Sequence, residues 1–273
     1  MWTYPAIDPV AFTLPFIDRE VHWYGLMYLI GLTGAWALAR YRTGIKAGGW
    51  TKEQVGDMVF YSAVGIIAGG RIGYGLFYGF EQWSQDFFWI LRVYEGGMSF
   101  HGGLIGVLCA FGYMAWKTNR TFFQVADFFA PVAPIGLFFG RLGNFINGEL
   151  WGRATSADFP LSMVFPHVDQ LPRHPSMLYE MVLEGFVLFV ILWWYSAKQR
   201  PRMATSALFL LFYGVFRAGV EFVRVPDEGI QVGYLGLEWM TRGQLLTLPM
   251  VLLGFAMLVI AYKRNVIDGN IKS

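Results

Sequence analysis

The sequence predicts an all-α polytopic membrane protein with seven transmembrane helices, an outside N-terminus and a cytoplasmic C-terminus. Its composition is the first reason, because 55% of the residues are hydrophobic and only 15% are charged. A soluble domain carries about 25% charged residues. The second reason is a set of seven apolar segments, each long enough to span ~30 Å of hydrocarbon as a helix. The third is the distribution of lysine, which orients these segments.

The seven segments follow one another without a linker, a charge block or a low-complexity stretch, so residues 1–273 are expected to form a single domain. Acidic residues, rather than a basic stretch, dominate the region just before the first segment. That segment is therefore expected to stay in the mature protein instead of serving as a cleaved signal. The segments lie near 22–40, 57–80, 98–116, 122–145, 177–197, 204–223 and 243–262.

Basic residues are concentrated in alternate connections. The loops after the first, third and fifth segments, with the C-terminal tail, contain twelve of the 21 basic residues and all six lysines. By the positive-inside rule these connections are cytoplasmic. The other connections, about 80–97, 151–175 and 225–241, are then on the outer side. They are rich in turn-forming and aromatic residues and are predicted to be small interfacial segments.

Glycines recur at small-xxx-small spacing in the predicted spans, which is typical of closely packed membrane helices. The single cysteine, Cys109, is expected to be a buried apolar filler in the third span. The glycine spacing occurs at Gly65, Gly69 and Gly73, at Gly75 and Gly79, at Gly102 and Gly106, and at Gly136 and Gly140.

Arginines within the predicted spans are the strongest functional signal. Arg141 follows an uncharged run over 128–140, and Arg217 ends another apolar run. A charge at bilayer depth costs at least ~2.5–3.5 kcal/mol on insertion scales, so it usually marks a functional site. Arginine binds phosphate through two parallel hydrogen bonds, and the abundant phosphate of a bilayer is the lipid headgroup. The two residues therefore predict a lipid-phosphate site.

Other polar residues reach the same depth. Counted from the cytoplasmic ends, Arg71, Arg141 and Arg217 all fall in the outer third of their spans. Tyr24 and His101 lie in the first turns of two spans that begin outside, and histidine is the commonest general base near neutral pH. Residues from five spans are therefore expected to meet at one level of the outer leaflet.

Each of these residues also has a structural alternative. Arg141 and Arg217 can pair with Glu149 and Glu221, which follow them within two turns; the second pair has the helical spacing of four. Arg71 can be purely structural. Likewise, His101 can be a residue whose hydrogen bonds are all made within the protein, and Tyr24 can belong to an aromatic belt at the membrane interface. Asn144 and Asn147 can be either helix caps or ligands for a glycerol hydroxyl. Glu180, Glu184 and Asp127 are expected to form hydrogen bonds between helices.

Five stretches resemble bacterial prolipoprotein diacylglyceryl transferases, in the family's order and over about residues 22 to 264. The most specific is GRLGNFINGELWG at 140–152. No motif of the family is matched at 154–171. The other stretches are HWYGLMY at 22–28, HGG at 101–103, RHPSMLYE at 173–180 and YGVFRAGVE at 213–221.

The resemblance implies transfer of diacylglycerol from phosphatidylglycerol to the lipobox cysteine of a prolipoprotein, with a thioether formed and glycerol phosphate released. The reaction is expected at the periplasmic face of the bacterial inner membrane, in a monomer that needs no metal or cofactor and binds no nucleic acid. The expected partners are phosphatidylglycerol, the prolipoprotein signal peptide and membrane lipids. With the depth argument, the expected catalytic residues are His101, Arg141, Arg217, Tyr24, Glu149 and Glu221. The expected substrate-binding residues are Arg141, taken as the phosphatidylglycerol ligand, Asn144, Asn147, Gly152, Tyr213 and Arg71.

Two other functions compete with the transferase. A lipid or anion transporter would also break helices at a polar site, but it should carry polar residues through both leaflets. Here the inner halves of the spans are nearly free of them. A passive lipid-binding or assembly protein would not need His101 and Glu149 beside the arginines. The transferase also explains why the chain lacks a reactive cysteine, since the substrate supplies the thiol.

Overall fold

A computed structural model describes residues 1–16, 18–45, 49–225, 233–234, 237 and 240–268. The chain folds into two compact units. The first combines Met1–Leu38 with Phe129–Ile267, and the second is formed mainly by Ala39–Phe128. Each unit is described by itself.

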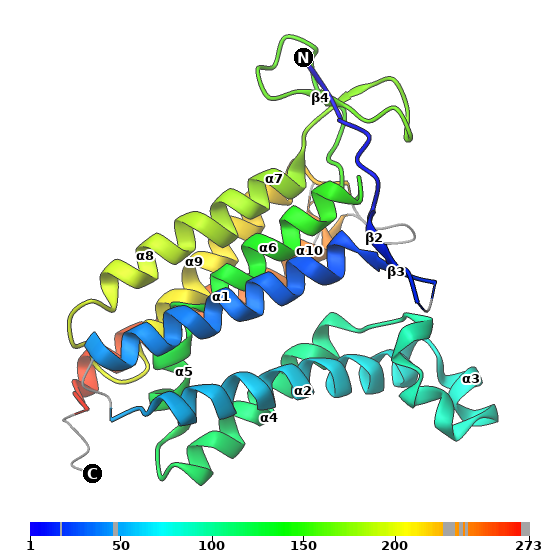
Figure 1. Cartoon of the computed structure of the whole chain (residues 1–273). Coiled ribbons are helices and arrows are strands. Elements are labelled where there is room, and N and C mark those ends of the chain that lie inside the picture. The colour runs from blue at the N-terminus through cyan, green and yellow to red at the C-terminus, as the bar shows by residue number, and fades with distance from the viewer. Residues whose placement is uncertain (17, 46–48, 226–232, 235–236, 238–239, 269–273) are drawn as a thin grey trace. The chain divides into compact units, whose positions relative to one another are not determined.

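The first unit is a bundle of helices (Figure 1). Its helix α9 packs along α10, and its helix α6 packs against the helix that begins at Ser176. That helix starts as α7, widens into the π-helix η3 and ends as α8. Gly254 allows the close approach of α9 and α10, because a Cβ there would lie 2.6 Å from the backbone nitrogen of Leu211. The helices are α1 (Trp23–Ile45, which continues into the second unit), α6 (Ala133–Ile146), α7 (Ser176–Glu180), η3 (Met181–Val187), α8 (Leu188–Tyr195), α9 (Ala204–Val220) and α10 (Arg242–Arg264).

Short strands cover one end of this bundle. A three-stranded sheet has the order β1-β4-β5, with β1 parallel and β5 antiparallel to β4, and β2 pairs with β3 in a separate hairpin. Tyr4, Phe165 and Met177 form a buried apolar cluster below the sheet. The Tyr4 hydroxyl donates to the Ile146 carbonyl at 2.6 Å, which ties the N-terminal segment to the end of α6. The strands are β1 (Trp2–Thr3), β2 (Val10–Leu14), β3 (Arg19–His22), β4 (Met163–Val164) and β5 (Pro172–Arg173).

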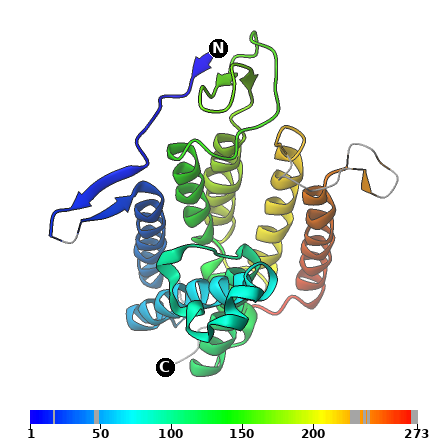
Figure 2. The same cartoon turned by 90° about the vertical axis from the view of Figure 1, so that its right-hand side faces the viewer.

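The second unit is built on two long helices that lie side by side, as Figures 1 and 2 show. A capping box at Thr51 starts the first of them, since its side chain accepts from the Gln54 backbone while Gln54 reaches back. The segment between the two helices contains only short helical turns. The elements are α2 (Lys52–Phe77), α3 (Phe80–Gln85), η1 (Phe87–Leu91), η2 (Val93–Glu95), α4 (Phe100–Lys117) and α5 (Phe122–Phe129).

Glycines form the contact between α2 and α4. A Cβ added at Gly65 would lie 2.5 Å from the carbonyl oxygen of Gly106, and one at Gly73 would lie 2.9 Å from the α-carbon of Gly102. No side chain fits at these distances, so the backbones touch directly. The predicted close packing of these small residues is confirmed. Cys109 on α4, in contrast, is exposed, so the expectation that it is buried was wrong.

Gly65→Ala should therefore lower the thermal unfolding temperature of the detergent-solubilised protein. Overpacking of this kind costs about 1–3 kcal/mol, because the new methyl group meets a backbone carbonyl that has no room to move aside. Gly56→Ala on the same helix is the matched control, since a Cβ there has nothing within 4 Å. Equal melting temperatures for the two variants would contradict the backbone contact.

Helices occupy all seven segments predicted to span the membrane. In the described part of the chain, three are long and apolar enough to cross a bilayer, and α5 with α6 would make a fourth. The span predicted at 122–145 is interrupted by a turn, because Pro131 and Pro134 lack backbone donors and clash with the preceding turn. The mostly helical fold is thus confirmed, with three or four candidate spans in the described residues, while the seven crossings and the orientation of the termini stay predictions. Most of the predicted outer segment 225–241 lies outside the described residues.

Candidate active site

Arg141 projects from α6 towards the helix that begins at Ser176. Its Nε lies 2.7 Å from Oε2 of Glu180, and its Nη2 lies 3.9 Å from Oε2 of Glu184. Its Nη1 donates to the side-chain oxygen of Asn144 at 3.3 Å. The pairing with Glu149 suggested by the sequence was wrong, since α6 ends at Ile146 and carries Glu149 past the reach of the guanidinium.

Glu149 is instead connected to Arg141 through an amide. Asn144 donates to Oε1 of Glu149 at 2.9 Å, and Asn147 donates to the same oxygen at 3.3 Å. Tyr24 on α1 lies beside this group, because a Cβ at Gly143 would be 2.9 Å from its ring, and its hydroxyl hydrogen bonds with that of Tyr28 at 3.1 Å. The structure thus brings together five of the residues predicted for the site: Tyr24, Arg141, Asn144, Asn147 and Glu149.

Arg217 lies on α9 and reaches the same region from the other side. Its Nη1 contacts Oε1 of Glu180, and its Nη2 lies 3.1 Å from Oε2 of Glu221. The pairing of Arg217 with Glu221 one turn later is confirmed. Glu221 is held in turn by Thr241, whose hydroxyl donates to Oε1 at 3.0 Å and which also caps the start of α10. One turn before Arg217, Tyr213 stacks its ring on Phe209.

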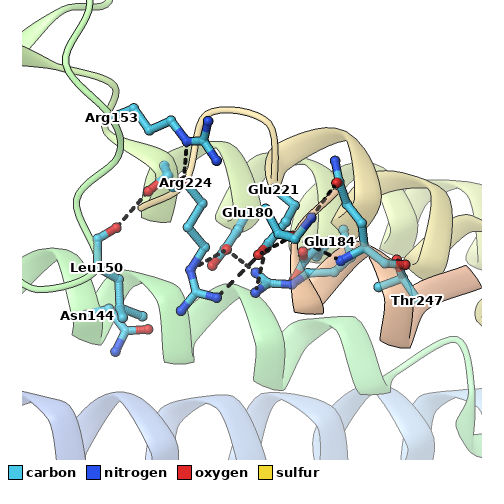
Figure 3. Close-up of polar contacts among 12 residues, drawn as sticks. Asn144, Leu150, Arg153, Glu180, Glu184, Glu221, Arg224 and Thr247 are labelled. Atoms are coloured by element: carbon cyan, nitrogen blue, oxygen red, sulfur yellow. Dashed lines mark hydrogen bonds and ion pairs between the residues drawn. The ribbon is translucent and has the colours of Figure 1, made fainter. Parts of the chain in front are cut away.

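Glu180 lies at the centre of these ion pairs (Figure 3). Its carboxylate is buried and contacts Arg141 through one oxygen and Arg217 through the other. A third arginine, Arg224, has its Nε 3.8 Å from Glu180 and its Nη1 3.9 Å from Glu221. The sequence predicted only a hydrogen-bonding role for Glu180, and Arg224 was missed. The spacing of Glu180 and Glu184, two buried carboxylates one turn apart, was the available signal.

The π-helix gives both carboxylates their place. Glu180 and Glu184 are fully buried where α7 widens into η3, and such π-turns are frequent at functional sites. Gly185 allows α6 to approach, because a Cβ there would lie 2.7 Å from Cβ of Phe138. Three arginines and three glutamates then share one low-dielectric region, where pairing offsets the cost of burial. Guanidinium groups held in this way are ready to bind an anion such as phosphate.

Gly152 joins three backbone segments at the end of the bundle. Its amide donates to the His174 carbonyl at 2.7 Å, and the Arg153 amide donates to the Val223 carbonyl at 2.7 Å. A bridge pairs Gly152 with Arg224, and Nε of Arg153 donates to the Arg224 carbonyl at 3.0 Å. Burial lowers the pKa of His174, which favours the neutral ring here. This crossing gives Gly152 a structural role beside Arg224, and a substrate contact at Gly152 stays a prediction.

Arg71 and His101 belong to the second unit. Arg71 is 2% exposed, and its guanidinium donates to the backbone carbonyls of four residues between α2 and α4 while lying 4.2 Å from the centre of the Trp89 ring. These contacts favour the structural alternative for Arg71, while its role in substrate binding stays a prediction. His101 is exposed at the first turn of α4, with its ring 5.7 Å from that of Phe100.

Comparisons with known proteins show the family of this chain. The family model described as prolipoprotein diacylglyceryl transferase matches residues 9–260. A phosphatidylglycerol–prolipoprotein diacylglyceryl transferase of Methylococcus capsulatus is 56% identical over 97% of this chain and 99% of its own length. The proteins of the same name from Ectopseudomonas mendocina and Azotobacter vinelandii are 54% and 56% identical, over 98% and 97% of this chain and 99% and 98% of their own lengths. The chain belongs to the prolipoprotein diacylglyceryl transferase family.

Proposed function

We propose that this protein transfers the diacylglyceryl group of phosphatidylglycerol to the lipobox cysteine of prolipoproteins, and that Arg141 and Arg217 bind the lipid phosphate. The observation that carries the site assignment is the meeting of these two guanidinium groups on one buried carboxylate. Full-length similarity to transferases of this name supports the reaction. The product is a thioether-linked lipoprotein precursor, made in the first step of lipoprotein maturation.

The reaction is a displacement at carbon. The cysteine sulfur attacks the glycerol carbon that bears the phosphate, so a C–S bond forms while the C–O bond to the phosphate breaks. The electron pair of that bond stays on the departing oxygen of glycerol phosphate, whose negative charge grows in the transition state. Arg141 and Arg217 stabilise this charge, and such preorganised donors in a dry site supply the largest catalytic term in many enzymes.

The thiol must lose its proton for this attack. A cysteine with a pKa of ~8.5 is mostly protonated near neutral pH. His101 is the general base we propose, and the positive field of the arginines also favours the thiolate. Asn144 and Glu149 form a hydrogen-bonded group beside Arg141, and with Tyr24, which packs against α6 at Gly143, they are proposed to orient the glycerol part of the headgroup. Asn147 donates to Glu149 and supports it.

Purified protein, phosphatidylglycerol and a lipobox peptide test the reaction directly. We expect stoichiometric release of glycerol phosphate and a peptide heavier by one diacylglyceryl group. A peptide with serine in place of the cysteine is the matched control and should give neither product. Release of glycerol phosphate and diacylglycerol without peptide modification would indicate a hydrolase of the phospholipase C type, and lipid movement without either product would favour the transporter.

The proposed setting is the bacterial cytoplasmic membrane, crossed seven times, with the site towards the periplasm and a monomer as the working form. A reporter that is active only in the cytoplasm, fused after Ser273, should be active, because all six lysines lie in the loops assigned to that side. A periplasmic reporter at the same position should be silent. The reverse pattern would overturn the orientation and the outer-leaflet site with it.

A further inference from the structure

We infer that Glu180 is a positioning residue, which holds Arg141 and Arg217 at the separation that lets both bind one phosphate group. The inference rests on the proposed function, since it concerns the same arginines. It assigns a task to a residue that makes no proposed contact with either substrate.

The contacts of Glu180 are divided between its two oxygens. Oε2 lies 2.7 Å from Nε of Arg141, and Oε1 contacts Nη1 of Arg217. Arg141 comes from α6 and Arg217 from α9, while Glu180 ends α7 between them. A carboxylate is planar and rigid, so the two nitrogens in contact with its oxygens are held at a limited separation.

The arginines keep donors for a ligand in this arrangement. A guanidinium has five N–H groups. Each arginine uses one nitrogen for Glu180 and a second for another partner, Asn144 for Arg141 and Glu221 for Arg217, which leaves N–H groups for a ligand. The arginine side chains remain 21% and 13% exposed, whereas the Glu180 side chain is 1% exposed. Glu180 is therefore closed to a ligand, whereas both arginine side chains stay partly accessible to one.

Charge balance alone does not account for Glu180. Glu184 is just as buried and lies one turn later on the same helix, but its only ion pair among the described residues is with Arg141 at 3.9 Å. Glu221 contacts Arg217 and, at 3.9 Å, Arg224. In the described part of the chain, Glu180 is the carboxylate that contacts both Arg141 and Arg217.

The test separates charge from geometry with two variants. Glu180→Gln keeps the length of the side chain and removes its charge, while Glu180→Asp keeps the charge and is too short to reach both arginines. Three quantities are measured for each: the KM for phosphatidylglycerol in mixed micelles, kcat, and the inhibition constant of glycerol phosphate. Glu184→Gln is the matched control for loss of a buried carboxylate on the same helix.

We expect both Glu180 variants to raise the KM and the inhibition constant by roughly 10–100-fold, as small misplacements of binding groups do. Adding Arg217→Lys to Glu180→Gln should cause little further loss, because the two changes disrupt one unit. The Glu184→Gln effect should be clearly smaller. Near-normal inhibition by glycerol phosphate in Glu180→Asp would overturn the inference in favour of charge alone. If Arg141→Lys and Arg217→Lys also kept normal inhibition, the proposed function of the arginines would fail instead.

Discussion

Arg141→Lys is expected to lower kcat/KM on the order of 100-fold, the usual effect of removing a preorganised donor to a developing oxyanion. Lysine keeps the charge, but its single ammonium group cannot contact Glu180 and Asn144 at once and still offer two parallel donors to phosphate. The measurement is release of glycerol phosphate by purified variant and wild-type protein at matched amounts.

The control for this change is Gly140→Ala, since a Cβ at the neighbouring position has nothing within 4 Å. It should retain activity, which would show that α6 tolerates substitution beside Arg141. A lysine variant with activity close to wild type would mean that only the charge of Arg141 matters, and the two-donor contact with phosphate would be abandoned.

Gly152→Ala should have an effect of similar size for a different reason. A Cβ at this position would lie 2.5 Å from the Val223 carbonyl oxygen and 2.6 Å from the His174 carbonyl oxygen. Neither backbone group can rotate away, so the crossing must open and Arg224 must shift. Overpacking costs about 1–3 kcal/mol and sometimes more. We expect both a lower melting temperature and a loss of activity.

Arg153→Gln separates the contribution of the Arg153 side chain to the crossing at Gly152 from that of the Gly152 backbone contacts. It removes the side-chain donor to the Arg224 carbonyl but leaves the Gly152 backbone contacts in place. Its effect should therefore be much milder than that of Gly152→Ala. If Gly152→Ala instead folded normally and changed only the affinity for lipid, that result would support the direct substrate contact predicted from the sequence.

The sequence predicted the helices well because hydrophobicity and length determine them. All seven predicted segments are helical, and the glycine contact of α2 with α4 follows from small-xxx-small spacing. The break between α5 and α6 was missed, although Pro131 and Pro134 are visible in the sequence. A hydropathy average over the whole segment hides such a break, whereas proline interrupts the backbone hydrogen bonds of a continuous helix.

The site was predicted only in part. Arg141 and Arg217 are conspicuous because a charge in an apolar run is expensive. Their partner Glu180 lies more than thirty residues from either one and reaches both only after α7 packs between α6 and α9. Arg71 looked like its counterparts in sequence, but its donors are taken by backbone carbonyls that the chain folds over it. The partners of these arginines could not be predicted from the sequence, because they depend on how the helices pack.

Binding of phosphatidylglycerol in the absence of peptide isolates the contact of Arg141 and Arg217 with the lipid phosphate from the transfer reaction. Equilibrium titration of a short-chain phosphatidylglycerol would be compared for wild type, Arg141→Lys and Arg217→Lys. If both arginines bind the phosphate, the Kd for the lipid should be at least about tenfold higher for each variant, equivalent to ~1.4 kcal/mol of lost binding free energy. Unchanged Kd values in folded variants would contradict this contact and leave Arg141 and Arg217 as structural residues.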